Sequence, residues 1–139
     1  MRDTANAMSG DNVEVVRRSI EAWNRQDRHG LRDLYRSEAE VDWSRSRSPF
    51  KGVYRGRHEI EEFWEVFWST WEDVRLEAHD FTEAGSDVVV WNTAHMRGRE
   101  GIEVSARTAL VFTVENGEIT CLRLFDEQDE ALEAVGLTG

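Results

Sequence analysis

The chain of 139 residues has one cysteine and one proline. The lone Cys121 excludes an intrachain disulfide and a cysteine-based zinc cage, and its strand-like surroundings favour a small buried apolar side chain over a reactive thiol. No segment approaches the ~18 consecutive apolar residues of a membrane span, and residues 1–10 lack the apolar core of a signal peptide. We therefore expect a cytoplasmic protein that does not enter a membrane.

Basic residues are in the minority, with 17 Lys and Arg against 28 Asp and Glu, and the formal net charge is −11. Such a field repels phosphate backbones and anionic lipid surfaces, so neither nucleic acids nor membranes are expected partners. A cationic segment between Trp43 and His58 has the opposite sign: it contains Arg45, Arg47, Lys51, Arg55 and Arg57 and no acidic residue. It either steers an acidic ligand or pairs with a second subunit, or it is only a solvated loop.

The length and the 40% apolar content predict one domain over residues 11–139. Residues 1–10 lack periodicity and predict a disordered tail. Asp11 and Glu14 have the spacing of an N-cap and N3 pair, which would start a first helix ending near residues 24–27. A short second helix carrying Leu31, Leu34 and Tyr35 then leads to a brief strand over 40–43.

The rest of the chain contains a third helix, a run of strands and a last helix. Ile60, Phe63, Trp64, Phe67 and Trp68 form one apolar stripe of the third helix. Strand patterns follow at 74–82, 87–97, 102–114 and 118–125, with a four-residue turn over 98–101 and Asn116-Gly117 as a hairpin signal. The last helix covers about 127–135 and ends at Gly136.

This order of elements predicts an α+β domain in which the helices gather on the concave face of a curved antiparallel sheet. If the helices do not fill that face, a pocket remains.

Several short strings resemble the nuclear transport factor 2-like superfamily, in particular its SnoaL-like, polyketide cyclase-like and ketosteroid isomerase-like branch. The strings that carry this resemblance are residues 23–27 (WNRQD), 39–43 (AEVDW), 54–57 (YRGR), 116–119 (NGEI) and 130–137 (EALEAVGL). Their order spans about residues 12–138. The resemblance implies a cone-shaped fold, an apolar pocket and a homodimer formed through the outer face of the sheet.

The resemblance does not imply one chemistry. Ketosteroid isomerases use a tyrosine of the first helix, a carboxylate at the end of the first strand and a protonated aspartate of a later strand. This chain has Ser19, Trp43 and Leu110 at the corresponding positions. Steroid isomerisation is therefore not expected.

The strand over 87–97 carries the first catalytic candidates. Counting through the turn at 98–101 places Trp91, Thr93, His95 and Arg97 on the concave side. There His95 could transfer protons and Arg97 could polarise a ligand oxygen. The structural alternative is a histidine bonded to a neighbouring strand and an arginine at the sheet rim.

Two carboxylates lie at strand ends. Asp42 would act as a base if the first strand is bulged, and otherwise it is a solvated strand residue or a partner of a nearby arginine. Asp126, like Asp42, is placed where a general base could face a cavity, but it immediately precedes the last helix, and the structural alternative is the N-cap of that helix.

The aromatic residues can line a ligand pocket, form the core, or do both. The full set of expected ligand-binding residues is Ser19, Trp23, Trp43, Tyr54, Phe63, Trp64, Phe67, Trp91, Thr93, Leu110 and Phe112. No metal-binding or phosphate-cradling motif is present, so neither a metal nor another cofactor is expected.

Three functions remain open. The leading one is a SnoaL-like protein that binds a small apolar or aromatic metabolite, with cofactor-free isomerase, cyclase or dehydratase chemistry as a further step. The second is a non-catalytic ligand-binding or dimerisation module of the same fold. The third, a protein–protein scaffold, would follow if aromatic side chains filled the cone completely. For the homodimer, Val88, Val90 and Met96 are expected to supply an apolar outer face.

Overall fold

The computed structural model describes residues 4–45 and 52–137 of the chain. In chain order the elements are α1 (Thr4–Asn24), α2 (Arg28–Leu34), β1 (Tyr35–Asp42), β2 (Val53–Arg55), α3 (Gly56–Thr70), β3 (Asp73–Ala84), β4 (Asp87–Arg97), β5 (Glu103–Glu115), β6 (Glu118–Phe125) and α4 (Gln128–Ala134). This mixed α+β architecture is the predicted fold class.

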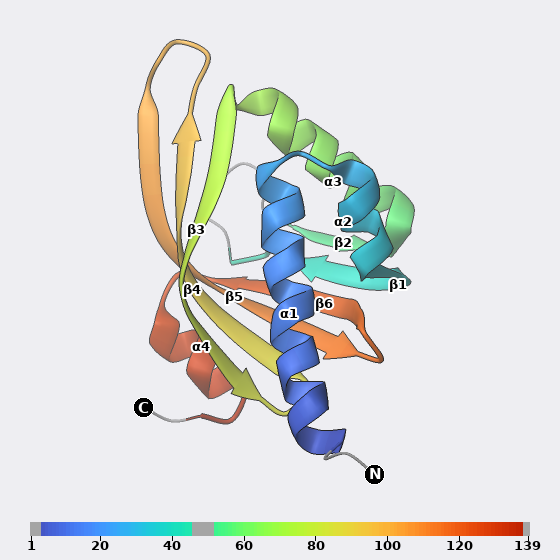
Figure 1. The fold of residues 1–139 in the computed structure, drawn as a ribbon. Coiled ribbons are helices and arrows are strands. Elements are labelled where there is room, and N and C mark those ends of the chain that lie inside the picture. Colours follow the sequence, from blue (N-terminus) through green and yellow to red (C-terminus); the bar gives the residue numbers. More distant parts are fainter. Residues whose placement is uncertain (1–3, 46–51, 138–139) are drawn as a thin grey trace.

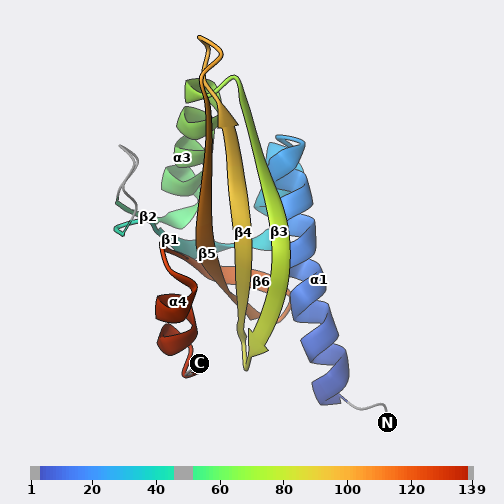
Figure 2. The same cartoon turned by 90° about the vertical axis from the view of Figure 1, so that its left-hand side faces the viewer.

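The strands form one strongly curved sheet in the order β2-β1-β6-β5-β4-β3 (Figure 1). Only the β1–β6 pair is parallel among these neighbours. The helices α1, α2 and α3 lie along the hollow side of the sheet, whereas α4 lies on the other side (Figure 2). Among the described residues, no helix is long and apolar enough to cross a membrane.

The first helix differs from the prediction at its start. Its backbone is helical from Thr4, so the expected start at an Asp11 cap is wrong. Ala5, Ala7 and Met8 are good helix formers, and no proline stops a helix that extends upstream of Asp11. The division into a tail over 1–10 and a domain over 11–139 stays a prediction.

The predicted apolar faces of α1 and α3 are buried. Val16 and Ile20 of α1, and Ile60, Phe63 and Phe67 of α3, belong to the main core between the helices and the sheet. Burying a side chain of this size stabilises the fold by about 1.5–3 kcal/mol. The first strand is longer than predicted and begins with Tyr35, which belongs to β1 and not to α2.

The end of α1 is fixed to the edge strand β3 by one side chain. The Asn24 amide donates to the Leu76 carbonyl over 2.9 Å, and the Leu76 N–H donates back to the Asn24 carboxamide oxygen over 2.8 Å. This pair of hydrogen bonds holds the helix layer against the far edge of the sheet.

The helix α4 corrects the expectation that all helices lie on the concave face. Ala131 packs with Val89, Val111 and Phe125 in a second, smaller core on the convex face. The N-cap of α4 is Glu127, which makes no side-chain cap bond, so the prediction of Asp126 as the N-cap is wrong by one residue. At the other end Gly136 has φ +85°, and the predicted glycine termination is observed.

The hairpin between β5 and β6 allows a test of backbone strain. Gly117 has φ +78° and no atom within 4 Å of an added Cβ, so Gly117→Ala suffers only the left-handed backbone cost. We expect it to lower the free energy of unfolding by about 1–2 kcal/mol in urea denaturation. Gly98→Ala is the control, because Gly98 lacks a positive φ and its Cβ would make ordinary contacts. An equal loss in both variants would contradict this explanation.

Candidate functional site

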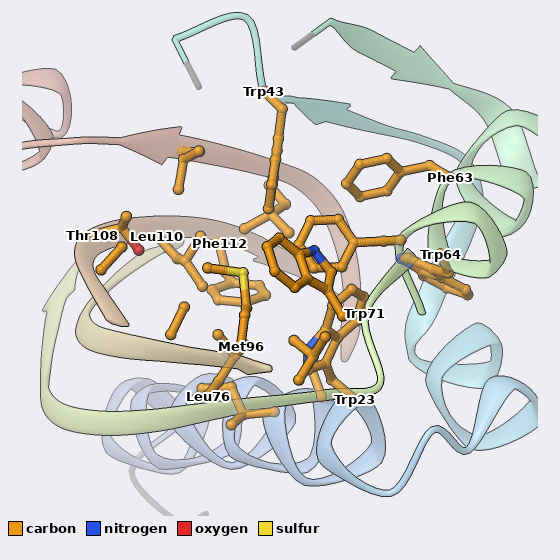
Figure 3. A pocket seen from close by; sticks show the side chains of 18 of the residues that line it. Trp23, Trp43, Phe63, Trp64, Trp71, Leu76, Met96, Thr108, Leu110 and Phe112 are labelled. Atoms are coloured by element: carbon orange, nitrogen blue, oxygen red, sulfur yellow. The ribbon is translucent and has the colours of Figure 1, made fainter. Parts of the chain in front are cut away.

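A cavity of about 490 Å³ lies between the concave face of the sheet and the helices. Figure 3 shows Leu76, Met96, Thr108 and Leu110 on its sheet side, facing Trp23, Trp71 and the α3 residues Phe63 and Trp64. The complete lining consists of Ser19, Ile20, Trp23, Leu31, Tyr35, Trp43, Phe63, Trp64, Phe67, Trp71, Val74, Leu76, Ala94, Met96, Val104, Ala106, Arg107, Thr108, Leu110, Phe112, Leu122, Leu124, Asp126 and Glu127. The lining is therefore mainly apolar and aromatic, as is typical of small-molecule sites.

The hollow depends on small side chains in the sheet. Ala94 of β4 and Ala106 of β5 are direct cross-strand partners, and both line the cavity. The next strand, β3, places Leu76 beside Ala94. Because this row carries two methyl groups where larger residues would reach the helices, it leaves space in front of the sheet.

Aromatic rings form the opposite wall. Trp23 lies 5.5 Å from Phe67, and Trp43 lies 5.1 Å from Phe63 and 5.5 Å from Phe67 between ring centroids. Tyr54 stacks on Phe63 at 4.5 Å. Contacts at these distances and tilts are favourable edge and stacked geometries, so the wall is a continuous aromatic cluster.

Few polar side chains reach the cavity. The hydroxyls of Ser19 and Tyr35 are hydrogen-bonded to each other, and both residues are buried. Burial raises the pKa of Tyr35 above its ordinary value by more than this hydrogen bond lowers it, so the phenol stays protonated at neutral pH. Arg107, Thr108, Asp126 and Glu127 supply the remaining polar groups of the lining.

Three indoles of the lining bear buried donors without partners. The Nε1 atoms of Trp23, Trp43 and Trp71 have no hydrogen-bond partner among the described residues, and the same holds for Trp68, which does not line the cavity. An unsatisfied buried donor costs about 1–3 kcal/mol. The aromatic wall therefore has unused capacity to donate hydrogen bonds.

Eight of the expected ligand-binding residues line the cavity: Ser19, Trp23, Trp43, Phe63, Trp64, Phe67, Leu110 and Phe112. That they bind a ligand stays a prediction. Tyr54 supports the wall through Phe63 without lining the cavity. Trp91 and Thr93 were expected inside, and this expectation is wrong: Trp91 packs against the small core under α4, and Thr93 bonds His79 on the outer face.

The expected orientation of His95 and Arg97 is also wrong. Their even-numbered neighbours Ala94 and Met96 line the cavity, so His95 and Arg97 point to the opposite face. There His95 Nε2 lies 2.9 Å from Glu77 Oε1 and Nδ1 lies 3.2 Å from Ser105 Oγ, and Arg97 pairs with Glu72 at 3.5 Å. This is the structural alternative, a histidine bonded to neighbouring strands.

The faces of β4 are opposite to those predicted because the loop between β4 and β5 is one residue longer than expected. The strands end at Arg97 and resume at Glu103, so residues 98–102 form a five-residue connection in place of the predicted four. With an odd number of residues in the connection, even-numbered residues of β4 lie opposite even-numbered residues of β5. Val90 is therefore the cross-strand partner of Leu110, and the two side chains share one face of the sheet. Val88, Val90 and Met96 consequently point inward, which removes the expected apolar outer face as support for a dimer.

Asp42 lies outside the cavity, although its neighbour Trp43 lines it. Partial burial raises the pKa of Asp42. The hydrogen bonds from Ser44 and the charges of Arg45 and Arg123 together lower it by more, so the pKa of Asp42 is below its ordinary value. Ser44 donates to Asp42 Oδ1 through its N–H at 3.0 Å and its hydroxyl at 2.6 Å. Asp42 is ionised at neutral pH, as a general base must be, but it does not line the cavity, so this position gives no support to its predicted role as the base.

Sequence reasoning missed Trp71, Tyr35 and Glu127 as lining residues, whereas Asp126, considered as a carboxylate that could face a cavity, does line it. Thr108 had a usable signal, because it shares the parity of Leu110 and Phe112 on one strand. Trp71 is the C-cap of α3 and lies outside the helical periodicity. Tyr35 was placed on the wrong element, so its face could not be assigned.

Two arginines of the cationic segment have partners. Arg55 pairs with Glu40 at 2.8 Å, and the guanidinium of Arg45 lies 4.7 Å from the centroid of the Phe125 ring. Arg47 and Lys51 fall outside the described residues. Steering of an acidic ligand by this segment stays a prediction.

Cys121 is a free, half-buried thiol on β6 whose pKa is raised, mainly by burial. Within residues 4–45 and 52–137, no group of three His, Cys, Asp or Glu side chains is arranged to hold a metal ion.

A curved sheet that encloses an apolar cavity with three helices defines the nuclear transport factor 2-like class. Within that class, residues 16–122 match the model of the SnoaL-like domain, and the chain belongs to this family. No curated protein matches the chain.

Solved structures agree with this assignment of the fold. TerC, co-crystallised with polyporic acid, has a TM-score of 0.75 at 20% identity, with 90% of this chain and 98% of that chain covered. RV0760c from Mycobacterium tuberculosis, in complex with estradiol-17beta-hemisuccinate, has a TM-score of 0.73 at 13% identity, covering 86% and 95%. SalBIII, an epoxide hydrolase/cyclase-like enzyme of pyran ring formation in salinomycin, has a TM-score of 0.73 at 20% identity, covering 86% and 93%.

The interactions of Asp42 predict a pH dependence of stability. A carboxyl whose folded pKa is depressed stabilises the fold above its unfolded pKa, about 3.9, and this contribution is lost as the pH falls through the folded value. We expect Asp42→Asn to be less stable than the wild type at pH 7, and the difference to shrink below about pH 4. Urea denaturation at pH 7, 5 and 3 measures it. A difference that is constant over this range would contradict the assignment.

Proposed function

We propose that this SnoaL-like protein binds a small apolar or aromatic metabolite in the cavity between its sheet and helices. The observation that carries the proposal is the cavity of about 490 Å³ with its aromatic wall. A cavity of this size is within the range of ~300–1,000 Å³ found for small-molecule sites. TerC and RV0760c, which share the fold, were both crystallised with small organic molecules.

The same cavity argues against a protein–protein scaffold. A scaffold was expected if aromatic side chains filled the cone, but Ala94 and Ala106 leave space in front of the sheet. Homodimerisation stays a separate proposal, supported now by the family resemblance alone, and the mass in solution will decide it.

Filling the hollow tests the binding function. Ala106→Phe places a ring in the cavity, and we expect it to weaken binding of the hydrocarbon 2-phenylnaphthalene at least tenfold, measured by quenching of tryptophan fluorescence. Ser105→Phe is the control, because Ser105 is the adjacent residue on the opposite face of the same strand. The proposal is refuted if the wild type does not bind 2-phenylnaphthalene saturably. It is also refuted if Ala106→Phe binds this probe as tightly as the wild type does.

Cofactor-free acid–base catalysis is a second candidate, favoured by the presence of Asp126 and Glu127 in the lining. Asp126 directly follows the last residue of β6, so a regular strand end holds it at the cavity. A carboxylate in this position can abstract a proton α to a ligand carbonyl. SalBIII, an epoxide hydrolase/cyclase-like enzyme, shows that the fold accommodates catalysis.

Hydrogen exchange tests this second candidate without knowledge of the substrate. We expect the wild type to accelerate deuterium incorporation at C1 of 2-tetralone in D₂O, followed by proton NMR, and Asp126→Asn to lower this rate at least tenfold, as removal of a general base does. Exchange at the buffer rate, or exchange unaffected by the substitution, would leave the protein as a binder.

A further inference from the structure

We infer that the cavity selects ligands that carry uncharged hydrogen-bond acceptors, such as carbonyl or ether oxygens, which the indole N–H groups of Trp23, Trp43 and Trp71 bind. This inference rests on the proposed binding function and narrows its ligand class. The observation behind it is the set of three buried indole donors, all on residues of the cavity lining and all without a partner among the described residues.

The polar groups of the aromatic wall are unbalanced toward donors. An indole N–H can only donate, and none of these three N–H groups has a hydrogen-bond partner among the described residues. Ser19 and Tyr35 use one of their two hydroxyl hydrogens between themselves. An incoming carbonyl would satisfy an indole donor that is otherwise orphaned, whereas the acceptors for an incoming donor group lie elsewhere in the lining, on Thr108, Asp126 and Glu127.

The three indoles lie at or next to the ends of their elements. Trp43 immediately follows β1, and Trp71 is the C-cap of α3. Trp23 is the penultimate residue of α1 and is 9% exposed. Because each Nε1 atom is buried, an acceptor reaches it only when neighbouring side chains shift, so ligand binding should change the environment of these three indoles together.

The charges of the lining favour a neutral acceptor over a carboxylate. Arg107 is the only cation among the described lining residues, and it is exposed and accompanied by Asp126 and Glu127. A carboxylate placed against the indoles would lose its hydration without a counter-charge. A carbonyl or ether oxygen avoids this penalty.

A matched pair of probes tests the inference. Flavone carries a carbonyl and a ring ether and no donor, and 2-phenylnaphthalene has the same outline without a heteroatom. We expect Trp23→Phe, Trp43→Phe and Trp71→Phe each to weaken flavone binding about two- to tenfold, the usual effect of one lost hydrogen bond. Binding of 2-phenylnaphthalene should change by less than twofold in the same variants, which controls for damage to the cavity.

Trp68→Phe is the matched control variant, because Trp68 also has an unpartnered buried Nε1 but lies outside the lining. It should leave the affinity for both probes unchanged. In ¹⁵N–¹H spectra, flavone should move the indole N–H signals of Trp23, Trp43 and Trp71 downfield and leave that of Trp91, on the other face, in place.

The possible failures are distinguishable. If 2-phenylnaphthalene binds and the three substitutions leave flavone affinity unchanged, or weaken both probes equally, the inference is overturned and the binding function stands. If neither probe binds the wild type, the proposed function fails and the inference fails with it.

Discussion

The cavity exists because the two layers of this fold carry side chains of different size. The helices and the segments beside them supply large rings, including Trp23, Phe67 and Trp71, whereas the facing row of the sheet carries Ala94 and Ala106. The rings contact one another laterally and keep the helix layer away from the sheet. Protein interiors are usually close-packed, but here the curvature of the sheet and the lateral contacts among the aromatic rings leave the cavity open.

Local sequence signals predicted most of the fold. The helical stripe of α3, the hairpin at Asn116-Gly117 and the termination of α4 at Gly136 each follow from a few neighbouring residues. The curved sheet with helices on its hollow side followed from the order of elements and from the family resemblance. The start of α1 was missed, because a plausible cap at Asp11 does not end a helix that good helix formers can extend.

The candidate site was harder to predict, since the face of a strand depends on its register with a distant partner. The loop between Arg97 and Glu103 has one residue more than predicted, so His95 and Arg97 lie on the outer face of the sheet and not on the predicted inner face. Residues predicted from helix periodicity, such as Phe63 and Phe67, line the cavity as expected, because that periodicity depends only on the helix itself. Trp71 and Tyr35 were missed because one lies beyond a helix end and the other at the junction of two elements.

The bonds between Asn24 and Leu76 also affect how the molecule meets other chains. β3 is an edge strand, and the outward N–H and C=O groups of an edge strand are a template for pairing with a foreign strand. The Asn24 carboxamide occupies both groups of Leu76 with the geometry of a strand neighbour. It therefore blocks strand pairing at this point of the edge and opposes edge-to-edge aggregation where α1 lies beside the sheet.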